Sequence, residues 1–406
     1  MDSVSDLTDT LGLPENFKLK TGTNGHSRRL KFLVTGGCGY FGYKLGKVLH
    51  TLGADVTLLD IQLPQKIQES LDDHLKFIRG DIRDYDSVLK SSAGMDCVYH
   101  IASFGMSGKD QLYKDLTEAI NVDGTRNVIK ACQMNNVQRL IYTSSYNVVL
   151  EGNPIIGGDE TLPYADPNKI VDYYSKSKLK ADKLILEANN TELNDGRQLK
   201  TCCLRPAGIY GPGERRHMQR IAKFIDWGII ILRIGDAVVD WTHVNNLIQA
   251  HLLAIPGLSK TSGYVAAGKA YFISDNRPLR VFEFLRPLFN GLGQEVPQYK
   301  CPYTIVYILA ILMEMLHYIL KPVLVIEPLL TRNEIMKMGI DHHHKMDQAI
   351  NDLGYKPMFY DFADTVALYL KERGSVSEKS KIAFHPLWTS VLFTIVTVII
   401  TISLCL

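Results

Sequence analysis

The stretch that decides the fold is KFLVTGGCGYFG, residues 31–42, in which an apolar run leads directly into a glycine-rich turn. Gly36, Gly39 and Gly42 follow one another at intervals of three residues. We expect a strand here that turns into a helix. In this arrangement main-chain N–H groups point at a pyrophosphate, which can come this close only where the residues are glycines. Asp60 stands 18 residues after Gly42, at the end of the next apolar run. A carboxylate there binds a ribose 2′-hydroxyl and repels a 2′-phosphate, so the pattern predicts a dinucleotide site that takes NAD in preference to NADP.

Further apolar runs of strand length alternate with segments of helical length and period through the first half of the chain. The runs are KFLVT (31–35), DVTLL (55–59), KFI (76–78), DCVYHIA (96–102), RLIYTSS (139–145) and KTCCL (200–204). Strands that alternate with helices form a parallel sheet covered on both faces. The sequence therefore predicts an α/β fold of the Rossmann type, a doubly wound parallel sheet, with ligands bound beyond the carboxyl ends of its strands.

The bulk composition argues against several other classes of protein. The chain has 45 Lys and Arg against 43 Asp and Glu, a net charge of +2, so nothing in it favours a nucleic-acid partner. Its seven cysteines show no metal-ligand spacing, which fits a reducing compartment and predicts no metal site. The histidine run at 342–344 has no supporting cysteine or carboxylate spacing and is interpreted as a polar loop.

The two ends of the chain differ sharply. Residues 1–29 are polar, and we interpret them as a flexible extension rather than a signal peptide. Residues 387–406 form twenty residues without a charge, and a membrane-spanning helix needs about 20 such residues. We therefore expect a linker at 374–386 and a transmembrane tail anchor at 387–406, with the folded body in the cytosol. The modest length of this tail suits the thinner bilayer of the endoplasmic reticulum.

The stretch DYYSKSK, residues 172–178, holds two tyrosines that could exchange a proton. Residues four apart share one face of a helix, so Tyr174 can meet Lys178 whereas Tyr173 can meet Ser177. A phenol ordinarily titrates near pH ~10, and an ammonium group held close lowers its pKa towards the working pH. The spacing favours Tyr174 with Lys178 as an acid/base pair, although an ordinary solvated helix face gives the same pattern. The Thr-Ser-Ser of 143–145 either holds a substrate oxygen or forms a turn after its strand.

Several motifs occur together and in a fixed order. They are the glycine turn, Asp60, VYHIAS (98–103), NVDGT (121–125), YTSS (142–145), YSKSK (174–178) and LRPAGIYGPGE (204–214). This set resembles the extended short-chain dehydrogenases/reductases, in particular the branch that contains 3β-hydroxysteroid dehydrogenases, sterol 4α-carboxylate 3-dehydrogenases and family 42E. The resemblance continues through VVDWTHVNNLIQAHLLA (238–254), EPLLT (327–331) and INDLGYKP (350–357).

The resemblance implies an oxidoreductase that acts on a CH–OH group with NAD. It implies that Tyr174 accepts the proton, that Lys178 lowers its pKa and binds the nicotinamide ribose, and that Asn121 supports the proton relay. Ser145 would hold the substrate oxygen, with adjacent Ser144 as a substitute. Members of the family form dimers through surface helices, so a homodimer of this chain would fit the resemblance. The cofactor contacts that it implies are made by Gly36, Gly39, Tyr40, Phe41, Gly42, Asp60, Asp81, Ile82, Ala102, Lys178 and Pro206.

Three details of the sequence stay open within this resemblance. Asp81 follows the third strand and either reaches the adenine or caps a helix. Asp172 and Tyr173 replace the small residue that the family often has before the tyrosine, so we expect them to crowd the site entrance. Sugar-nucleotide epimerases and dehydratases share the same core and would require a basic clamp for a diphosphate. Arg215, Arg216 and Arg220 are the candidates for such a clamp.

The second half of the chain points to a lipophilic substrate. Residues 302–320, PYTIVYILAILMEMLHYIL, are apolar except at Glu314 and His317, which argues against a simple membrane span. A helix packed on the protein or lying in the membrane interface fits better, and a sterol or steroid could then enter from the bilayer. We expect an NAD-binding domain at 30–250, with 205–225 contributing to the substrate site, and a substrate-binding region at 251–373. A dinucleotide-binding sensor or a membrane scaffold is the remaining alternative.

Overall fold

The computed structural model describes residues 4–14, 17, 19–21, 28–230, 232–320 and 330–376, so the predicted tail anchor at 387–406 lies outside the described residues. At its centre is a seven-stranded sheet in which all neighbouring strands are parallel. From one edge to the other the strands are β14 (Lys269–Ile273), β9 (Lys200–Pro206), β7 (Arg139–Thr143), β6 (Cys97–His100), β3 (Lys31–Thr35), β4 (Asp55–Asp60) and β5 (Leu75–Arg79). The predicted Rossmann-type sheet is confirmed, and all six predicted strands are present.

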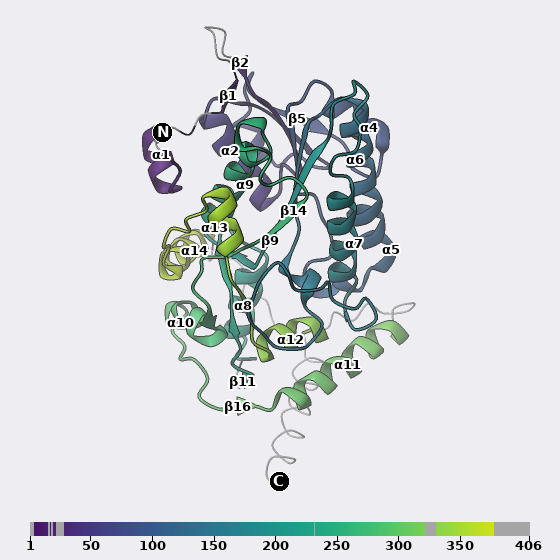
Figure 1. Ribbon diagram of the computed structural model, residues 1–406. Coiled ribbons are helices and arrows are strands. Elements are labelled where there is room, and N and C mark those ends of the chain that lie inside the picture. The colour runs from purple at the N-terminus through teal and green to yellow at the C-terminus, as the bar shows by residue number, and fades with distance from the viewer. Residues whose placement is uncertain are drawn as a thin grey trace.

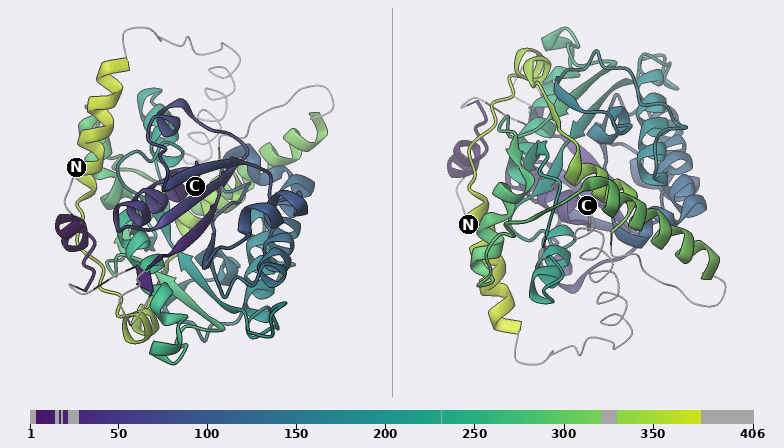
Figure 2. Two further views of the ribbon diagram at one scale, coloured as in Figure 1. Left: turned by 90° about the horizontal axis from the view of Figure 1, so that it is seen from above. Right: turned by 90° about the horizontal axis from the view of Figure 1, so that it is seen from below.

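Helices cover both faces of this sheet (Figures 1 and 2). Successive strand residues point to opposite faces, so Phe32 and Val34 of β3 belong to one core and Leu33 to the other. All three side chains are fully buried, which is why β3 is a continuous apolar run rather than an alternating one. One face carries α2 (Tyr40–Thr51), α9 (Val244–Gly257) and α13 (Asp347–Leu353), and the other carries α4 (Tyr85–Ser92), α6 (Gly124–Met134) and α7 (Tyr173–Glu187).

Strand β14 changes the domain boundary that the sequence predicts. It pairs in parallel with β9, from Lys269 opposite Cys202 to Ile273 opposite Pro206, and so forms one edge of the main sheet. The Rossmann-type domain therefore does not end at residue 250. A strand from the predicted substrate region completes it, because edge pairing depends on contacts far apart in the sequence.

The N-terminal segment is packed rather than free. Helix α1 (Val4–Thr10) leads into Leu11 and Leu13, whose side chains are buried in the same core as α2 and α9. The Leu11 carbonyl oxygen accepts a hydrogen bond from Gln249 Nε2 at 2.6 Å. The predicted flexible extension is therefore wrong for residues 4–14, since its apolar side chains find a place in the core.

A smaller lobe lies beyond the carboxyl ends of the main strands (Figure 1). Its four-stranded sheet consists of β15 (Leu279–Arg280), β12 (Val238–Val239), β17 (His342–His344) and β8 (Ile155–Gly158). Its helices are α8 (His217–Asp226), α10 (Val281–Gly291), α12 (Arg332–Gly339) and α14 (Phe362–Val376). Two parallel strands, β10 (Gly208–Tyr210) and β13 (Trp241–His243), join it to the main sheet, and β11 (Arg233–Ile234) pairs with β16 (Lys300–Cys301).

The three histidines form strand β17 and not the predicted polar loop. The rings of His342 and His344 lie 5.2 Å and 5.9 Å from the ring of Tyr146, centre to centre, and both histidines are buried. His343 points the other way, where its Nδ1 accepts the N–H of Gly157 at 3.2 Å. Within the described residues, no group of three or more His, Cys, Asp or Glu side chains is arranged to hold a metal ion.

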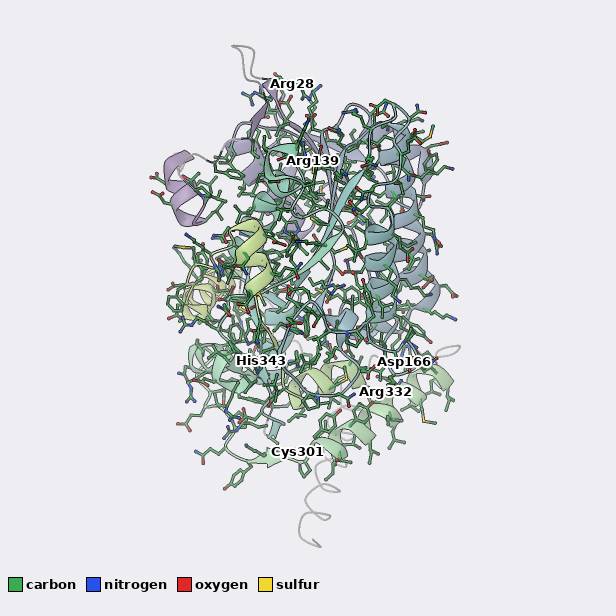
Figure 3. The ribbon with its side chains drawn as sticks, in the orientation of Figure 1. Arg28, Arg139, Asp166, Cys301, Arg332 and His343 are labelled. Carbon is green, nitrogen blue, oxygen red and sulfur yellow. The ribbon has the colours of Figure 1, made fainter. Side chains whose placement is uncertain are left out.

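Helix α11 (Tyr303–Leu320) has its polar side chains inside and its apolar ones outside. Glu314 and His317 are buried, whereas Leu312 and Ile319 are 54% and 69% exposed. The Glu314 carboxylate accepts hydrogen bonds from N and Nε of Arg332, each at 2.7 Å, where α12 meets α11 (Figure 3). Over the described ranges, α11 is the one helix long and apolar enough to cross a membrane by length and composition. The two polar residues that interrupt its sequence therefore serve packing against the protein.

Candidate active site

A large cavity lies where the carboxyl ends of the main strands meet the smaller lobe. Its volume is about 1530 Å³. The residues that line it include every predicted cofactor contact and every predicted catalytic residue except Asn121. They are Gly36, Gly39, Tyr40, Phe41, Gly42, Asp60, Asp81, Ile82, Ala102, Ser145, Tyr174, Lys178 and Pro206.

The glycine turn after β3 forms one wall of this cavity. Gly36 has a φ of +67°, a left-handed conformation that glycine adopts without steric cost. A Cβ on Gly42 would collide with the Gly36 carbonyl oxygen, so α2 can begin this close to the turn only with glycine there. Gly39 is the N-cap of α2, and a Cβ on it would approach Gly36 O at 3.2 Å. A helix N-terminus without side chains on its approach fits the pyrophosphate of a dinucleotide.

The two predicted acidic contacts of the cofactor have different surroundings. Asp60, at the end of β4, accepts two main-chain N–H bonds at 2.8 Å and 3.0 Å, which fix its carboxylate at the cavity wall. Asp81 instead forms an ion pair with Arg83 at 2.5 Å, and hydrogen bonding from this guanidinium lowers the pKa of Asp81. The helix-capping role considered for Asp81 belongs to Asp84, whose side chain accepts from the first turn of α4. Asp60 is thus the acid best placed to read a ribose.

Tyr174, Ser145 and Lys178 meet in the middle of the cavity. Tyr174 and Lys178 share one face of α7, which Asp172 caps by accepting a first-turn N–H at 2.7 Å. Ser145 follows β7, and its side chain lies close enough to the Tyr174 phenol to lower the pKa of that phenol. Lys178 Nζ lies 5.9 Å from the centre of the Tyr174 ring and donates to the Thr143 carbonyl oxygen at 2.7 Å. The carboxyl end of β7 and the first turns of α7 therefore build this group together.

Asp172 and Tyr173 do not crowd the entrance as the sequence suggests. The Asp172 side chain is buried in its capping position, and the Tyr173 side chain lies near Tyr318 of α11, where it contributes to the raised pKa of that phenol. Neither residue lines the cavity. The expectation is wrong because the start of α7 turns both side chains away from it.

Burial dominates the electrostatics of this group. It raises the pKa of Tyr174, while the positive charge of Arg216 and the interaction with Ser145 act in the opposite direction. It also lowers the pKa of Lys178 to about 7. The sequence spacing predicts Lys178 as the cation that lowers the pKa of Tyr174, whereas in the structure the cation whose charge lowers this pKa is Arg216. Lys178 is itself desolvated and directed at a carbonyl oxygen, and Arg216 is the cation that acts on the phenol.

Asn121 lies beside the cavity and not in it. It occupies a single turn of π-helix, η2 (Ala119–Asp123), and its side chain is buried. Its Nδ2 donates to Ser177 Oγ and to the Phe104 carbonyl oxygen, both at 2.8 Å, and its Oδ1 accepts the Phe104 N–H at 2.8 Å. These bonds hold Ser177 of α7 against the loop at Phe104, which lines the cavity. Because Ser177 directly precedes Lys178, Asn121 is a positioning residue.

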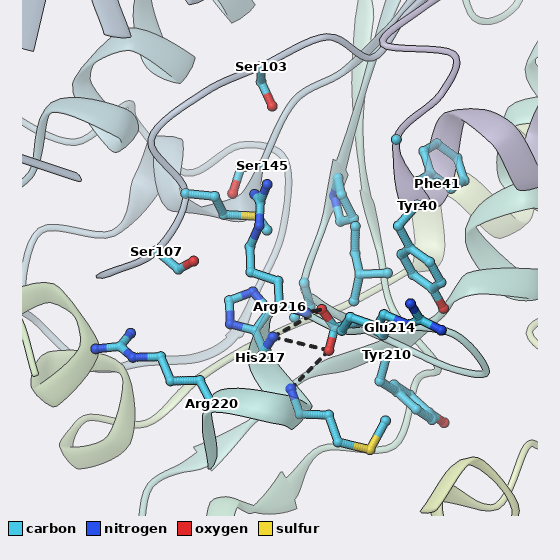
Figure 4. Close-up of a pocket in the computed structure, with 18 of the residues that line it drawn as sticks. Tyr40, Phe41, Ser103, Ser107, Ser145, Tyr210, Glu214, Arg216, His217 and Arg220 are labelled. Carbon is cyan, nitrogen blue, oxygen red and sulfur yellow. Dashed lines mark hydrogen bonds between the residues drawn. The ribbon is translucent and has the colours of Figure 1, made fainter. Parts of the chain in front are cut away.

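Sequence reasoning missed Glu214, which organises the far side of the site. Its buried carboxylate accepts the main-chain N–H groups of Arg216, His217 and Met218 at 2.7–3.1 Å, the start of α8 (Figure 4). An acid directly before an amphipathic helix is the signal that could have found it. Around α8 and beyond it, the cavity wall contains many apolar side chains. They include Phe224, Ile230, Phe282, Phe284, Leu285, Val306 and Leu309.

Comparisons with known proteins match this arrangement. Residues 33–302 fit the model of the 3-beta hydroxysteroid dehydrogenase/isomerase family. The chain belongs to this family. One relative is short-chain dehydrogenase/reductase family 42E member 1 of Danio rerio. It is 45% identical to this chain over 378 residues, which cover 92% of this chain and 96% of that protein. Sterol-4-alpha-carboxylate 3-dehydrogenase, decarboxylating, of Mus musculus is 32% identical over 338 residues, 83% of this chain and 89% of that protein.

As a member of the 3-beta hydroxysteroid dehydrogenase/isomerase family, the chain is a short-chain dehydrogenase that depends on a nicotinamide dinucleotide, and the predicted family is confirmed. Among solved structures, dTDP-glucose 4,6-dehydratase DesIV of Streptomyces venezuelae, determined with NAD, superimposes with a TM-score of 0.64. The match covers 85% of this chain and 98% of that chain at 21% identity. A likeness at this identity supports the fold and leaves the substrate to be argued from the site.

Proposed function

We propose that this family member is a membrane-associated, NAD-dependent dehydrogenase that oxidises the hydroxyl group of a lipophilic alcohol, with a 3β-hydroxysteroid or sterol as the leading substrate. One observation supports the proposal most directly, namely that three different groups of residues line a single cavity. The glycine turn and Asp60 line one end, Tyr174 and Ser145 the middle, and apolar side chains of α8, α10 and α11 the other end. A dinucleotide and an apolar alcohol entering from opposite ends would meet at Tyr174.

The mechanism follows from the groups at that meeting point. Tyr174 takes the hydroxyl proton during oxidation and returns it during reduction. Ser145, whose side chain acts on the pKa of the same phenol, holds the same substrate oxygen while negative charge develops on it. Lys178 binds the nicotinamide ribose, and Asn121 holds α7 so that both α7 residues keep their places. NAD, when bound, supplies the acceptor for the hydride. The Asp60 carboxylate favours the ribose of NAD, which has a free 2′-hydroxyl, over the 2′-phosphorylated ribose of NADP.

The outward face of α11 supports membrane association. Leu312 and Ile319 are exposed, whereas Val306 and Leu309 of the same helix line the cavity. One helix that presents apolar side chains both to the cavity and to the outside suits an interfacial position through which a lipid could enter. This face of α11 and the uncharged segment at 387–406 together support our proposal that the chain is a tail-anchored protein of the endoplasmic reticulum. Its folded domain then lies in the cytosol.

The sugar-nucleotide alternative finds little support in the candidate clamp. Arg215 pairs with Glu372 at 3.3 Å, and Arg220 pairs with Glu334. Two of the three candidate arginines therefore already have carboxylate partners and would have to give them up to hold a diphosphate. A sensor or scaffold is also disfavoured, because such a role does not need the Tyr174 group.

The proposal is tested by incubating the purified full-length protein in detergent with NAD and a panel of 3β-hydroxysterols, and following the absorbance of the reduced cofactor. Tyr174→Phe removes only the hydroxyl, and we expect kcat to fall about 10²–10⁴-fold. Tyr173→Phe makes the same change outside the cavity and should keep its activity. Turnover that survives Tyr174→Phe would contradict the assigned chemistry. NAD binding without any turnover would reject these sterols, and no NAD binding would favour a sensor or scaffold.

Membrane delivery of the substrate has its own test. The double substitution Leu312→Glu/Ile319→Glu places charges on the outward face of α11. We expect it to lower turnover of a sterol offered in lipid vesicles several-fold and to leave turnover in detergent unchanged. Ile156→Glu, at a side chain 72% exposed on β8, is the control. Equal activity of all variants with vesicles would reject this path of entry.

A further inference from the structure

The segment that follows α8 separates the cavity from the outside of the smaller lobe. Trp227, the C-cap of α8, is 42% exposed and lies outside the cavity lining, whereas Ile229, Ile230 and Leu232 line the cavity. The ring of Trp227 lies 6.3 Å, centre to centre, from the ring of Phe224, which also lines the cavity. One layer of apolar side chains therefore stands between the cavity and an exposed indole ring.

Helix α11 has the same two-sided construction and lies next to this segment. Val306 and Leu309 line the cavity, while other side chains of the helix point outward. The segment leads into β11, which pairs with β16 directly before α11, and the N–H of Arg233 donates to the Tyr299 carbonyl oxygen at 2.8 Å. Strands β11 and β16 and helix α11 lie together at the end of the molecule away from the main sheet (Figure 1). Exposed side chains of these segments form what we call the apolar surface, namely Trp227, Tyr299, Leu312, Met315, Leu316 and Ile319.

The composition and charges of the apolar surface suit the interface of a lipid bilayer. Trp and Tyr are enriched at the depth of the lipid headgroups, and aliphatic side chains along one face of a helix suit the boundary with the acyl chains. Two acids flank the segment after α8 in the sequence, and both are in ion pairs. Asp226 pairs with Arg373 at 2.7 Å, and Asp236 pairs with Lys300 at 3.6 Å. Contact with lipid headgroups therefore leaves neither carboxylate as a lone negative charge.

The predicted tail anchor begins close to this surface. Helix α14 ends at Val376, and its Arg373 is the partner of Asp226, the residue directly before Trp227. Eleven residue steps separate Val376 from Leu387, where the uncharged segment begins. A chain of that length spans at most roughly 40 Å. A tail that crosses the bilayer would therefore keep the apolar surface near the lipid headgroups.

We propose that the apolar surface rests on the headgroup layer of a phospholipid bilayer, so that the folded domain contacts the membrane directly through Trp227 and α11 and does not merely hang from its tail. The inference rests on the proposed function, from which it takes the tail anchor. It adds a second membrane contact, the segment after α8, to the outward face of α11. The outer side of the cavity wall then lies against lipid, and an apolar substrate leaves the bilayer by crossing one layer of side chains.

The test measures whether lipid reaches Trp227 in the full-length protein. The protein is reconstituted in vesicles of phosphatidylcholine whose acyl chains carry bromine near the headgroup, a quencher of tryptophan fluorescence, and in the same vesicles without bromine. The chain has three tryptophans, Trp227, Trp241 and Trp388. Trp388→Phe leaves Trp227 with Trp241, and Trp227→Phe/Trp388→Phe gives the fluorescence of Trp241 alone. An interfacial segment lies about 5–10 Å deep in the boundary of headgroups and acyl chains, so we expect bromine to lower the Trp227 fluorescence about twofold.

Two further variants serve as controls, and unchanged affinity for NADH shows that each of them folds. Leu312→Glu/Ile319→Glu, added to Trp388→Phe, should reduce the quenching of Trp227, because a single surface holds both segments against the bilayer. Met134→Trp, added to Trp227→Phe/Trp388→Phe, places an indole at the opposite end of the molecule. Met134 is exposed and ends α6 just before β7, whose first residue Arg139 lies far from Cys301 of β16 (Figure 3). This indole should stay unquenched.

The outcomes separate this inference from the proposed function. An unquenched Trp227, or equal quenching of the Met134→Trp indole, would overturn the inference, because the apolar surface would then be covered by water, by a second copy of the chain or by no particular orientation on the membrane. A quenched Trp388 in the Trp227→Phe variant would in that case leave the tail anchor standing. Quenching of Trp227 beside an unquenched Trp388 would support the surface contact and reject the tail anchor. None of these results depends on turnover, so the dehydrogenase activity stands or falls by its own assay.

Discussion

The Gly36→Ala variant is expected to lose both stability and cofactor affinity, and Gly53→Ala is its matched control. Both glycines have left-handed backbones, with φ of +67° and +86°. They differ in what surrounds them. A Cβ on Gly36 would lie 2.8 Å from Ala102 Cα and 2.9 Å from Ala102 N, whereas a Cβ on Gly53 has nothing within 4 Å. The pair therefore separates the cost of the backbone conformation from the cost of close approach.

The expected magnitudes follow from these contacts. Alanine in a left-handed conformation costs about 1–2 kcal/mol at either position. At Gly36 the added overlap is with main-chain atoms, which no change of rotamer can relieve, and such overpacking costs about 1–3 kcal/mol more. We thus expect a loss of unfolding free energy of roughly 2–5 kcal/mol for Gly36→Ala against about 1–2 kcal/mol for Gly53→Ala. Because Gly36 and Ala102 both line the cofactor end of the cavity, relieving the overlap must also shift a cofactor contact.

The assay is urea unfolding of the full-length protein in detergent, followed by tryptophan fluorescence with and without NADH. At a hundred times its dissociation constant, a ligand raises the unfolding free energy by about 2.7 kcal/mol. We expect this increment in the wild type and in Gly53→Ala at one fixed NADH concentration, and a smaller one in Gly36→Ala. Equal losses of stability in the two variants, with equal NADH increments, would refute the reasoning, since they would show that the turn can move away from Ala102 without cost.

Three further predictions concern charged groups. Asp60→Ser removes the carboxylate that repels a 2′-phosphate, so the ratio of kcat/KM for NAD over NADP should fall at least tenfold in steady-state assays. Burial lowers the pKa of Lys178 to about 7 in the folded protein, so above that pH the unfolded chain binds more protons than the folded one. The unfolding free energy should therefore rise between about pH 7 and pH 10, by up to about 1.4 kcal/mol per pH unit from this group. A Lys178→Met variant should lack that slope in urea titrations. Asp182→Asn leaves the buried Arg205 without its 2.8 Å ion pair and should cost about 3–5 kcal/mol of unfolding free energy, whereas Asp195→Asn at an exposed pair should cost less than about 1 kcal/mol.

Features that depend on neighbours in the chain were predictable. The strand before the glycine turn, the helix after it and Asp60 at the end of the next strand follow from apolar runs and turn residues within a few positions of one another. The choice of Tyr174 over Tyr173 follows from helix spacing, and the structure places Tyr174 in the cavity with Ser145. The family resemblance added residues such as Pro206 that no local pattern marks, and the structure places Pro206 in the same cavity.

Features that depend on packing between distant segments were not predictable. Helix α11 has an apolar sequence, but which side chains face the protein depends on Arg332 meeting Glu314 from another helix. Strand β14 joins the sheet through β9, nearly seventy residues earlier in the chain, and the histidine run becomes a strand because β8 and β12 flank it.

The sequence by itself determined the nucleotide-binding half of this protein, because a strand, a glycine turn and a helix in succession have one compact arrangement and its ligand site lies at their junction. Only the tertiary structure decided the electrostatics of the reacting centre. Lys178 is four residues from Tyr174, yet burial lowers its pKa and its Nζ is bound to a carbonyl oxygen. Arg216 stands forty-two residues from Tyr174 in the chain, and the packing of α8 against the cavity brings its charge to the phenol. The strength of a Coulomb interaction depends on distance and burial in the folded protein, and neither is written in sequence spacing.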